Sequence, residues 1–286
     1  MGRIQYDASA LDPILSTLFL LCASAAAGLL GSLTGLGGGV VIVPLLVLAF
    51  GIDVPYAVGA SLVAVVANSS GSAAAYVRDG FTNVRVAILL ETVTVAGAIL
   101  GAIIAGFVSK TFVTTVFGLV AMWSAYSALR PSPHTVEDGK PDPLATKLGL
   151  DSTWPSKDGM RAYHVRGVPG AMGVMLGAGV LSAIIGVGSG IVKVLAMDRI
   201  MRLPFKVSTT TSNFMMGVTA AAGCGVYLSR GQLEPSLCAP VALGALLGSM
   251  LGARLLGRMD SRVLRLIFAI AVAAAGVQMM LKGFQG

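Results

Sequence analysis

Charged side chains are scarce in this chain. Asp, Glu, Lys and Arg make up 12% of its 286 residues, whereas a typical soluble domain holds about a quarter. Hydrophobic residues make up 55%, and the mean hydropathy is +0.84. Several apolar runs exceed the roughly 20 residues that a helix needs to cross a bilayer. The composition therefore excludes an ordinary soluble domain and predicts an all-α polytopic membrane protein with about eight to ten membrane segments.

Histidine and cysteine are also few. The two histidines, His134 and His164, lie in a polar middle region, and the three cysteines, Cys22, Cys224 and Cys238, share no metal-binding spacing. The apolar segments carry no paired carboxylates, no histidine and no nucleophile–base pair at working spacing. The sequence thus predicts no metal, no cofactor and no catalytic residue, which argues against a membrane-embedded enzyme.

The net charge of +7 has a different meaning here from that in a nucleic-acid-binding protein. Lys and Arg lie in short connections between apolar segments, as the positive-inside rule describes. We therefore expect the lipid bilayer of a bacterial or archaeal inner membrane as the partner, and no nucleic acid. The sequence leaves homo-oligomerisation open.

The chain contains two copies of one unit. A shift of 151 positions aligns residues 28–128 with 179–279. The paired positions include Gly35 with Gly186, Gly37 with Gly188, Gly39 with Gly190, Ser61 with Ser212, Tyr76 with Tyr227, and Gly97 with Gly248. Such internal symmetry is typical of secondary transporters. It predicts one membrane repeat at 14–129 and a second at 168–283.

Between the copies, residues 130–167 are rich in proline and charge. This composition cannot form a membrane element, because it lacks apolar surface to bury and contains several helix breakers. We expect an exposed, largely irregular linker.

Each copy divides into four apolar stretches. These are 14–50, 56–77, 86–108 and 112–129, and then 168–201, 205–228, 236–257 and 262–283. The first stretch of each copy is too long for one span, and glycines, which form helices poorly, interrupt it at 35–39 or 186–190. The piece after each break has 11 residues, about half a bilayer. The N-terminal run also resembles a signal peptide, but the recurrence of its pattern inside the chain favours a first membrane segment.

Two topologies fit this pattern. If each first stretch is one kinked span, the copies are parallel; if each is a re-entrant hairpin, the copies are inverted. Of the 20 Lys and Arg, all but Lys193 can be assigned to a side, and they divide 11 to 8 in the kinked arrangement but 15 to 4 in the hairpin arrangement. Because positive charge gathers on the cytoplasmic side, the sequence predicts two inverted-topology repeats. Each has a glycine-broken re-entrant hairpin plus three transmembrane helices, with both termini extracytoplasmic and the linker cytoplasmic.

The inverted arrangement is expected to bring the two hairpin tips together near mid-membrane, where each short helix begins. The first N–H groups of a helix lack internal partners and carry the positive end of its dipole. Two such ends facing one cavity would bind an anion without a base or a metal. The backbone and side chains expected at this substrate site are those of Gly35, Gly37, Gly38, Gly39, Gly186, Gly188, Ser189 and Gly190.

Polar side chains beyond the breaks extend the predicted substrate site. They are the hydroxyls and amides of Ser61, Asn68, Thr211, Ser212 and Asn213, which can donate to oxyanions, and the cation Lys193. Each has an alternative role. A hydroxyl in a membrane helix also bonds its own or a neighbouring backbone, and a lysine can snorkel towards the cytoplasmic side.

Two acidic residues and two glycine series are expected to have structural roles. Glu91 is predicted to pair with Arg85 rather than to relay protons, and Asp198 to be a loop-end residue beside Arg199. The series at 97 and 101 and at 244, 248 and 252 are expected to be packing faces, because small residues let membrane helices approach closely.

Two glycine-containing segments resemble those of a known family, the TauE/SafE sulfite-exporter-like permeases. Residues 31–44 (GSLTGLGGGVVIVP) with 58–62 (VGASL) resemble its first signature, and 186–190 (GVGSG) with 211–220 (TSNFMMGVTA) resemble its second. The resemblance covers most of the two membrane repeats and implies movement of sulfite, sulfonates or related small anions. The halves differ, since Ser189 stands opposite Gly38 and Lys193 opposite Ile42.

These patterns together predict a secondary transporter, working as an exporter, of small anions such as sulfite or organosulfonates. It would operate by alternating access around a midplane site at the two hairpin tips. Two alternatives stay open at this point: an anion channel with the same lining, and a non-catalytic membrane subunit of a larger complex.

Overall fold

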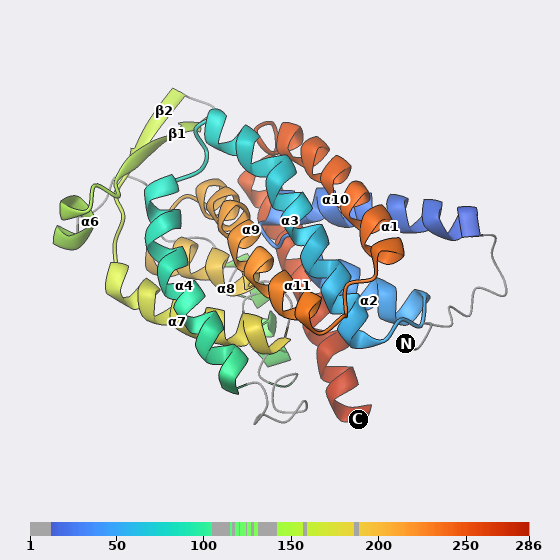
Figure 1. Cartoon of the computed structure of the whole chain (residues 1–286). Helices are drawn as coiled ribbons and strands as arrows, with labels where there is room; N and C mark the ends of the chain where they lie inside the picture. The colour runs from blue at the N-terminus through green and yellow to red at the C-terminus, as the bar shows by residue number, and fades with distance from the viewer. Residues whose placement is uncertain are drawn as a thin grey trace.

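A computed structural model of the chain describes residues 13–104, 142–156, 159–185 and 189–285, with scattered positions between 115 and 130. This part of the chain is mostly helical (Figure 1). The first half contains α1 (Pro13–Thr34), α2 (Gly39–Ala49), α3 (Val54–Arg78) and α4 (Val84–Ile104). The second half contains α7 (Val168–Ile185), α8 (Gly190–Leu195), a π-helical turn η1 (Ala196–Ile200), α9 (Phe205–Ser229), α10 (Pro235–Leu256) and α11 (Ser261–Gln285).

The helix bounds repeat along the chain at the same offset as the residues. Residues 39–49 form α2, and residues 190–200, which lie 151 positions later, form α8 and η1 without a gap. Likewise α3 covers 54–78 and α9 covers 205–229. The two copies in the sequence are therefore two copies of one order of helices.

The first predicted break is a turn of left-handed backbone. Gly35, Gly37 and Gly38 have φ of +75°, +72° and +77°, a region that residues with a Cβ rarely adopt. This turn ends α1 and starts the 11-residue α2. In the second half α8 begins at Gly190 as predicted, whereas Gly186 and Gly188 lie outside the described residues.

Five described helices are long and apolar enough to cross a membrane: α1, α3, α4, α10 and α11. The apolar segment Val168–Ser182 of α7 is shorter. Helix α9 has 25 residues, but its first half carries the buried polar run 208–213, which lowers its hydropathy. The stretch expected at 112–129 lies largely outside the described residues. Among the described residues five helices qualify as spans, compared with the eight to ten membrane segments predicted for the whole chain.

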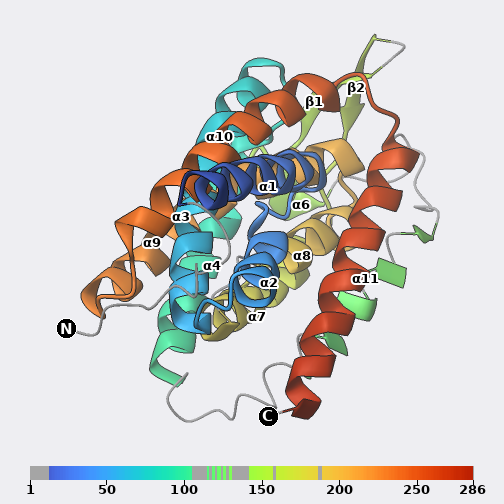
Figure 2. The ribbon, with the colours of Figure 1, turned by 90° about the vertical axis from the view of Figure 1, so that its right-hand side faces the viewer.

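The closest helix contacts join one half of the chain to the other. Helix α1 of the first half lies against α10 of the second, and α7 of the second lies against α4 of the first (Figures 1 and 2). A Cβ added to Gly248 would lie 1.9 Å from Ala25 O, and one added to its counterpart Gly97 would lie 2.1 Å from Leu176 O. Both distances are shorter than any real Cβ contact, so these glycine series are close packing faces, as predicted.

Several connections gather at one end of the molecule, at the upper left in Figure 1. They are the α3–α4, η1–α9 and α10–α11 connections and residues 142–167. The contacts that join them are Phe81 with Gly257, Asn83 with Leu150, and Arg166 with Met201. The α2–α3 and α9–α10 connections meet at the opposite end, where a Cβ on Gly59 would lie 2.7 Å from Gln232 O.

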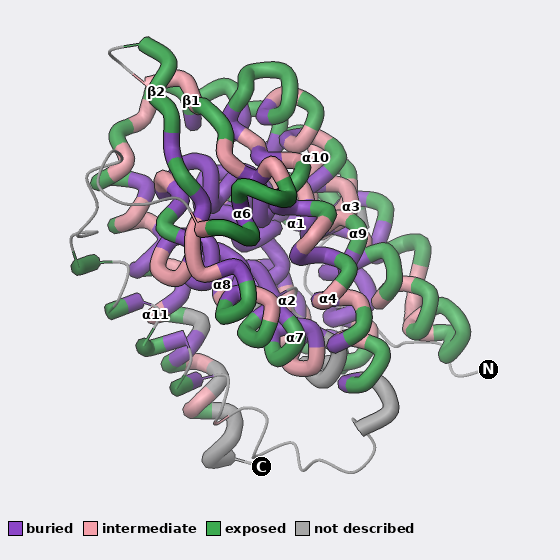
Figure 3. The backbone as a smooth tube through the Cα atoms, turned by 90° about the vertical axis from the view of Figure 1, so that its left-hand side faces the viewer, coloured by how far each residue is buried: buried purple, intermediate pink, exposed green. Residues whose placement is uncertain are grey.

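The linker is more ordered than its composition suggested. Its second part forms a short helix, α6 (Pro143–Lys147), and an antiparallel hairpin of β1 (Ser152–Ser156) and β2 (Gly159–Tyr163). Leu150, Tyr163 and Val165 are buried against the ends of α4, α7 and α9 (Figure 3). Burial raises the pKa of Tyr163 to about 12, so its phenol stays protonated while it accepts a hydrogen bond from Asn83 Nδ2 (3.0 Å). The prediction of a largely irregular linker is therefore wrong for residues 142–166, because a few apolar residues dock the hairpin on the helix ends.

Candidate functional site

The first glycine turn is held between α3 and α9. Ser212 Oγ of α9 donates to Gly35 O (2.8 Å), and Ser61 Oγ of α3 lies 3.4 Å from Gly39 O. A Cβ on Gly39 would lie 2.8 Å from the Ser61 hydroxyl. These equivalent serines of the two repeats therefore bind the backbone at either end of the turn.

The two breaks touch one another. A Cβ on Gly190, at the start of α8, would lie 2.7 Å from Gly35 O and 3.0 Å from Leu36 Cα. Met216 of α9 fits between the breaks, since its sulfur lies 2.7 Å from the Cβ position of Gly190 and 3.2 Å from that of Gly37. The sequence predicted that the two tips would meet, and the described residues of each are in direct contact.

Helix α9 contacts the two breaks through Ser212 and Met216, which lie on one face of the helix. Residues 212, 216 and 219 share one face at i, i+4 and i+7 spacing, while Asn213 faces α1 and α3. Asn213 Nδ2 donates to Ser32 O (2.7 Å), and Ser69 Oγ donates to Asn213 O (2.7 Å). Asn68 Nδ2 donates to Asn213 Oδ1 (3.4 Å), and Thr211 Oγ1 accepts from Asn83 N (3.1 Å). Several predicted substrate ligands thus also hold helices together.

Two buried polar atoms next to the breaks lack a hydrogen-bond partner within the described part of the chain. They are Ser189 Oγ and Asn68 Oδ1. Ser189 stands at the N-cap of α8, where a serine side chain commonly binds a backbone N–H, yet it makes no capping bond. A buried polar group without a partner costs about 1–3 kcal/mol, so an anion that accepts from the Ser189 hydroxyl would regain that free energy. Asn68 Oδ1 is an acceptor and would need a donor instead.

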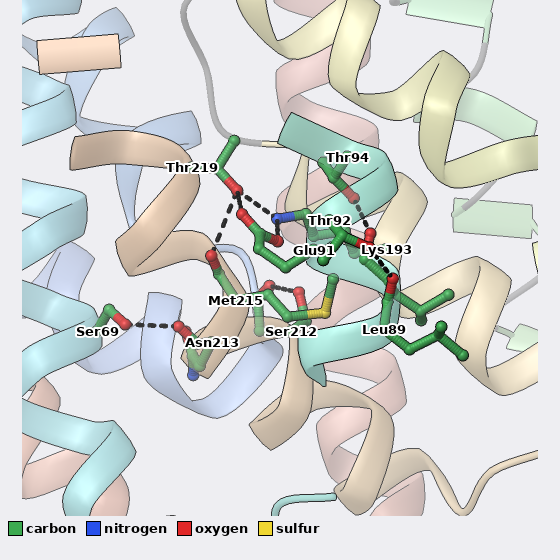
Figure 4. Close-up of polar contacts among 12 residues, drawn as sticks. Ser69, Leu89, Glu91, Thr92, Thr94, Lys193, Ser212, Asn213, Met215 and Thr219 are labelled. Carbon is green, nitrogen blue, oxygen red and sulfur yellow. Dashed lines mark hydrogen bonds and ion pairs between the residues drawn. The ribbon is translucent and has the colours of Figure 1, made fainter. Parts of the chain in front are cut away.

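Three side chains form a buried charged cluster one turn beyond the second break (Figure 4). Lys193 Nζ lies 3.0 Å from Glu91 Oε2 and 2.6 Å from Thr219 Oγ1, and the Thr219 hydroxyl donates to Glu91 Oε1. Lys193 is fully buried, and Glu91 and Thr219 are 8% and 6% exposed. The cluster joins α4, α8 and α9 and carries no net charge in this form.

This cluster overturns one expectation, the pairing of Glu91 with Arg85, and excludes the alternative role considered for Lys193. Glu91 does not pair with Arg85, whose Nη1 instead donates to Gly149 O (2.7 Å). Lys193 does not snorkel to the surface, because its buried ammonium is held by Glu91 and Thr219. The signal was present in the sequence, since a carboxylate and an ammonium inside apolar segments each need a partner, but they lie 102 positions apart.

Asp198 also differs from its expected role. It is 3% exposed within η1, and Arg265 of α11 binds both of its carboxylate oxygens, at 2.8 and 2.9 Å. Its neighbour Arg199 lies 3.3 Å away through Nε. Asp198 therefore forms a buried salt bridge that joins η1 to α11, and it is not a loop-end residue.

The arrangement favours an anionic ligand over other chemistry. Helices α2 and α8 both begin beside the contact between the breaks, and unpaired N–H groups at helix starts attract negative charge. The Ser189 hydroxyl offers an open donor there, and Lys193 follows within one turn. Among the described residues, no group of three or more His, Cys, Asp or Glu could hold a metal ion.

Comparisons with known proteins point to the same family as the glycine segments. A family model described as "Sulfite exporter TauE/SafE" matches residues 20–279. The "Probable membrane transporter protein YunE" of Bacillus subtilis (strain 168) is 24% identical over 277 residues, which cover 94% of this chain and 99% of that protein. No solved structure matches the chain.

Proposed function

This chain belongs to the TauE/SafE sulfite exporter family and is a multi-pass membrane transporter, and from that premise we propose that it exports small anions such as sulfite or organosulfonates. The substrate lies at the contact between the two glycine breaks. The observation that carries this placement is the meeting of Gly35 with Gly190 beside the open hydroxyl of Ser189. A sulfite or sulfonate group has only acceptor oxygens, which match N–H and O–H donors.

Two features make this place selective for anions. The first N–H groups of α2 and of the segment 190–200 have no carbonyl within their own helix to bond. Lys193 adds a full positive charge within one turn of Gly190 once its carboxylate partner is displaced or neutralised. A cation would meet only repulsion from these groups, whereas a small oxyanion gains charge-assisted hydrogen bonds.

The two repeats have inverted topology in this proposal, each entering the membrane as a re-entrant hairpin. Three observations support it. The basic residues divide 15 to 4 in this arrangement, and the segments that carry most of the fifteen gather at one end of the molecule. A kinked-span arrangement would instead put the α3–α4 and α10–α11 connections on opposite sides. Finally, the α3–α4 and α9–α10 connections are equivalent in the two repeats yet lie at opposite ends of the molecule, as inverted repeats require.

Transport proceeds by alternating access around this fixed site. The family placement and the internal repeat favour a carrier, because repeats that rock against each other expose a central site to each side in turn. The glycine interfaces of α1 with α10 and of α4 with α7 each join one half to the other, so either can form part of a rigid moving body.

Counterflow in proteoliposomes tests this function. The protein is reconstituted with unlabelled sulfite inside, and uptake of trace ³⁵S-sulfite from outside is followed over time. A carrier predicts transient accumulation of label that saturates with external sulfite. Flux that never saturates would indicate an anion channel, and no flux of sulfite or of organosulfonates from the purified protein would indicate a subunit that needs partners.

A thermal-shift screen with sulfite, sulfonates, sulfate and carboxylates identifies the substrate class. A ligand that binds only the native protein raises its apparent melting temperature with concentration. Stabilisation by carboxylates alone would contradict the sulfur oxyanion assignment.

A further inference from the structure

The charged cluster occurs in only one half of the molecule. At the offset of 151 the counterparts of Lys193, Thr219 and Glu91 are Ile42, Asn68 and Ala242. Ile42 is fully buried in α2, as Lys193 is buried in α8. The fold therefore builds the same short helix with an apolar side chain at this position, and it does not need an ion pair there.

Keeping an ion pair at this depth is costly. The desolvation of two charges commonly offsets their mutual attraction, and apolar residues of similar volume are often as stable. Ionisable residues inside membrane segments are accordingly rare and tend to lie on ion or substrate pathways. Since the first half manages without the pair, its presence in the second half points to a role in transport.

We propose that Glu91 is the proton-binding residue that couples transport to protons, with Lys193 changing partner between Glu91 and the substrate. This inference rests on the function proposed above and adds the coupling ion to it. Because an inward proton gradient opposes outward movement of a proton with the anion, net export in this scheme is driven by the outward concentration gradient of the anion. In the described form Lys193 binds the Glu91 carboxylate. When a substrate anion binds, Lys193 pairs with it, and Glu91 takes one proton and becomes a neutral carboxylic acid.

The exchange conserves charge. Before binding, the cluster holds one ammonium and one carboxylate; afterwards it holds the ammonium, the substrate anion and a neutral acid. One monovalent anion therefore moves with one proton, and the loaded and empty sites both have zero net charge. A neutral site avoids carrying an uncompensated charge through an apolar environment.

The geometry gives each member of the cluster a part in this exchange. The Glu91 side chain is 10% exposed while that of Lys193 is completely buried, and the carboxylate is the member of the pair that can take up a proton, since the ammonium has no free acceptor site. Thr219 bonds both groups, and its hydroxyl has a second acceptor, Met215 O at 3.3 Å. The hydroxyl can thus turn away when Glu91 becomes a donor.

The pair has few competitors for the proton. Helix α7, which packs on α4, has no charged residue. On α9, Lys206 binds Gly257 O (3.2 Å) at the end of the bundle, and on η1 Asp198 and Arg199 bind each other while Arg265 also holds Asp198. A metal cation is disfavoured at Glu91 because the Lys193 ammonium already occupies the carboxylate.

The first test uses the unaltered protein. If one proton binds with each anion, the Kd for the anion rises about tenfold for each pH unit wherever the free Glu91 is ionised. Methanesulfonate and sulfite serve as probes, and methanesulfonate stays ionised across the assay range, so it cannot carry the proton itself. A Kd for both probes that does not change between pH 6 and 8 would overturn the proposal.

The second test separates coupling from binding. In proteoliposomes with the membrane voltage clamped, an imposed pH gradient should drive accumulation of the probes. The Glu91→Gln variant should keep counterflow, but its pH-driven accumulation of the probes should be at least tenfold lower than that of the unaltered protein. Because Glu91→Gln leaves Lys193 unpaired, the doubly neutral Glu91→Gln, Lys193→Met variant provides a second protein with balanced charge. It should fold but, lacking the cation that binds the anion, should lose both counterflow and pH-driven accumulation; counterflow in this variant would contradict the role of Lys193.

Matched controls locate the effect in one half. Ile42→Met changes the counterpart of Lys193 without changing charge and should leave pH-driven accumulation intact. Accumulation in Glu91→Gln equal to that of the unaltered protein would refute coupling through Glu91 while leaving the transport function standing. Absence of counterflow in the unaltered protein would instead refute the proposed function and, with it, the coupling.

Discussion

At the residue scale, the polar side chains near the breaks divide into those that hold the fold and those that remain open. Ser212 and Asn213 each donate a hydrogen bond to a backbone carbonyl of the first half, so both already have a structural role. Ser189 Oγ and Asn68 Oδ1 are buried without a partner in the described residues. An anionic substrate needs an open donor, which the Ser189 hydroxyl supplies and the Asn68 carbonyl oxygen does not, and we therefore place its contacts on Ser189 before the others.

This distinction gives a test at Ser189. Ser189→Ala removes a buried hydroxyl that bonds nothing in the described form, so the melting temperature should stay the same or rise slightly. Affinity for the transported anion should fall roughly tenfold or more, because a hydrogen bond to a charged ligand contributes about 1.5–3 kcal/mol. Titration of sulfite by thermal shift measures both quantities on one sample.

Ser24→Ala is the matched control for this test. Ser24 Oγ is also buried and without a partner among the described residues, but it lies on α1 facing α10, where Gly244 approaches it. It should share the small stability change without the loss of affinity. Equal affinity in both variants would remove Ser189 from the site. Larger substitutions at Gly190 are less informative, since a Cβ there already meets Gly35 O at 2.7 Å.

Residue identity predicted one member of the charged cluster but not the pairing. Lys193 is conspicuous because a lysine inside an apolar run is rare, and Glu91 is conspicuous for the same reason. Glu91 was matched to its sequence neighbour Arg85, and Lys193 was assigned to the substrate site without a partner, since one sequence gives no information on contacts over 102 positions. Thr219 has no signal of its own, because threonines occur in membrane helices without charged partners.

At the element scale, the helix starts and ends were largely predictable. Glycines end α1 and start α2 because three of them adopt φ near +75°, and an apolar run of 11 residues is too short to span. The same pattern placed the short helix after Gly190 correctly. The β1–β2 hairpin was not predictable, because its stability comes from docking Tyr163 and Leu150 on distant helices rather than from an alternating pattern.

The first break also yields a stability test. Gly35→Ala places a Cβ at φ +75° and 2.7 Å from Thr209 O, whereas Gly51→Ala places one at φ +62° with nothing within 4 Å. The left-handed backbone alone costs about 1–2 kcal/mol, and crowding adds roughly 1–3 kcal/mol. Thermal unfolding in detergent should therefore show a clearly larger loss for Gly35→Ala than for Gly51→Ala. Equal losses would mean that the turn is not packed against α9.

At the scale of the whole molecule, one structural unit used twice explains both the packing and the charge distribution. Gly97 on α4 and Gly248 on α10 are equivalent positions, and each lets the first helix of the opposite repeat approach its backbone. The repeat could be recognised in the sequence. The contacts of α1 with α10 and of α4 with α7 could not, because no local sequence pattern indicates which helices pack together.

The orientation of the molecule in the membrane is the last prediction. If the repeats are inverted, Asp53 in the α2–α3 connection faces outwards and Thr153 in β1 faces the cytoplasm, and both are exposed. In a variant with Cys22, Cys224 and Cys238 replaced by alanine, Asp53→Cys should react with a membrane-impermeant maleimide in intact cells. Thr153→Cys should react only after permeabilisation, because fifteen basic residues hold that end in the cytoplasm. Labelling of both positions from the same side would contradict this placement of the two connections. The two arrangements differ at Arg230→Cys, at the exposed start of the α9–α10 connection: it should react in intact cells if the copies are inverted, and only after permeabilisation if they are parallel. A cytoplasmic reporter signal at either terminus would contradict the re-entrant hairpins, since each hairpin returns the chain to the side from which it came.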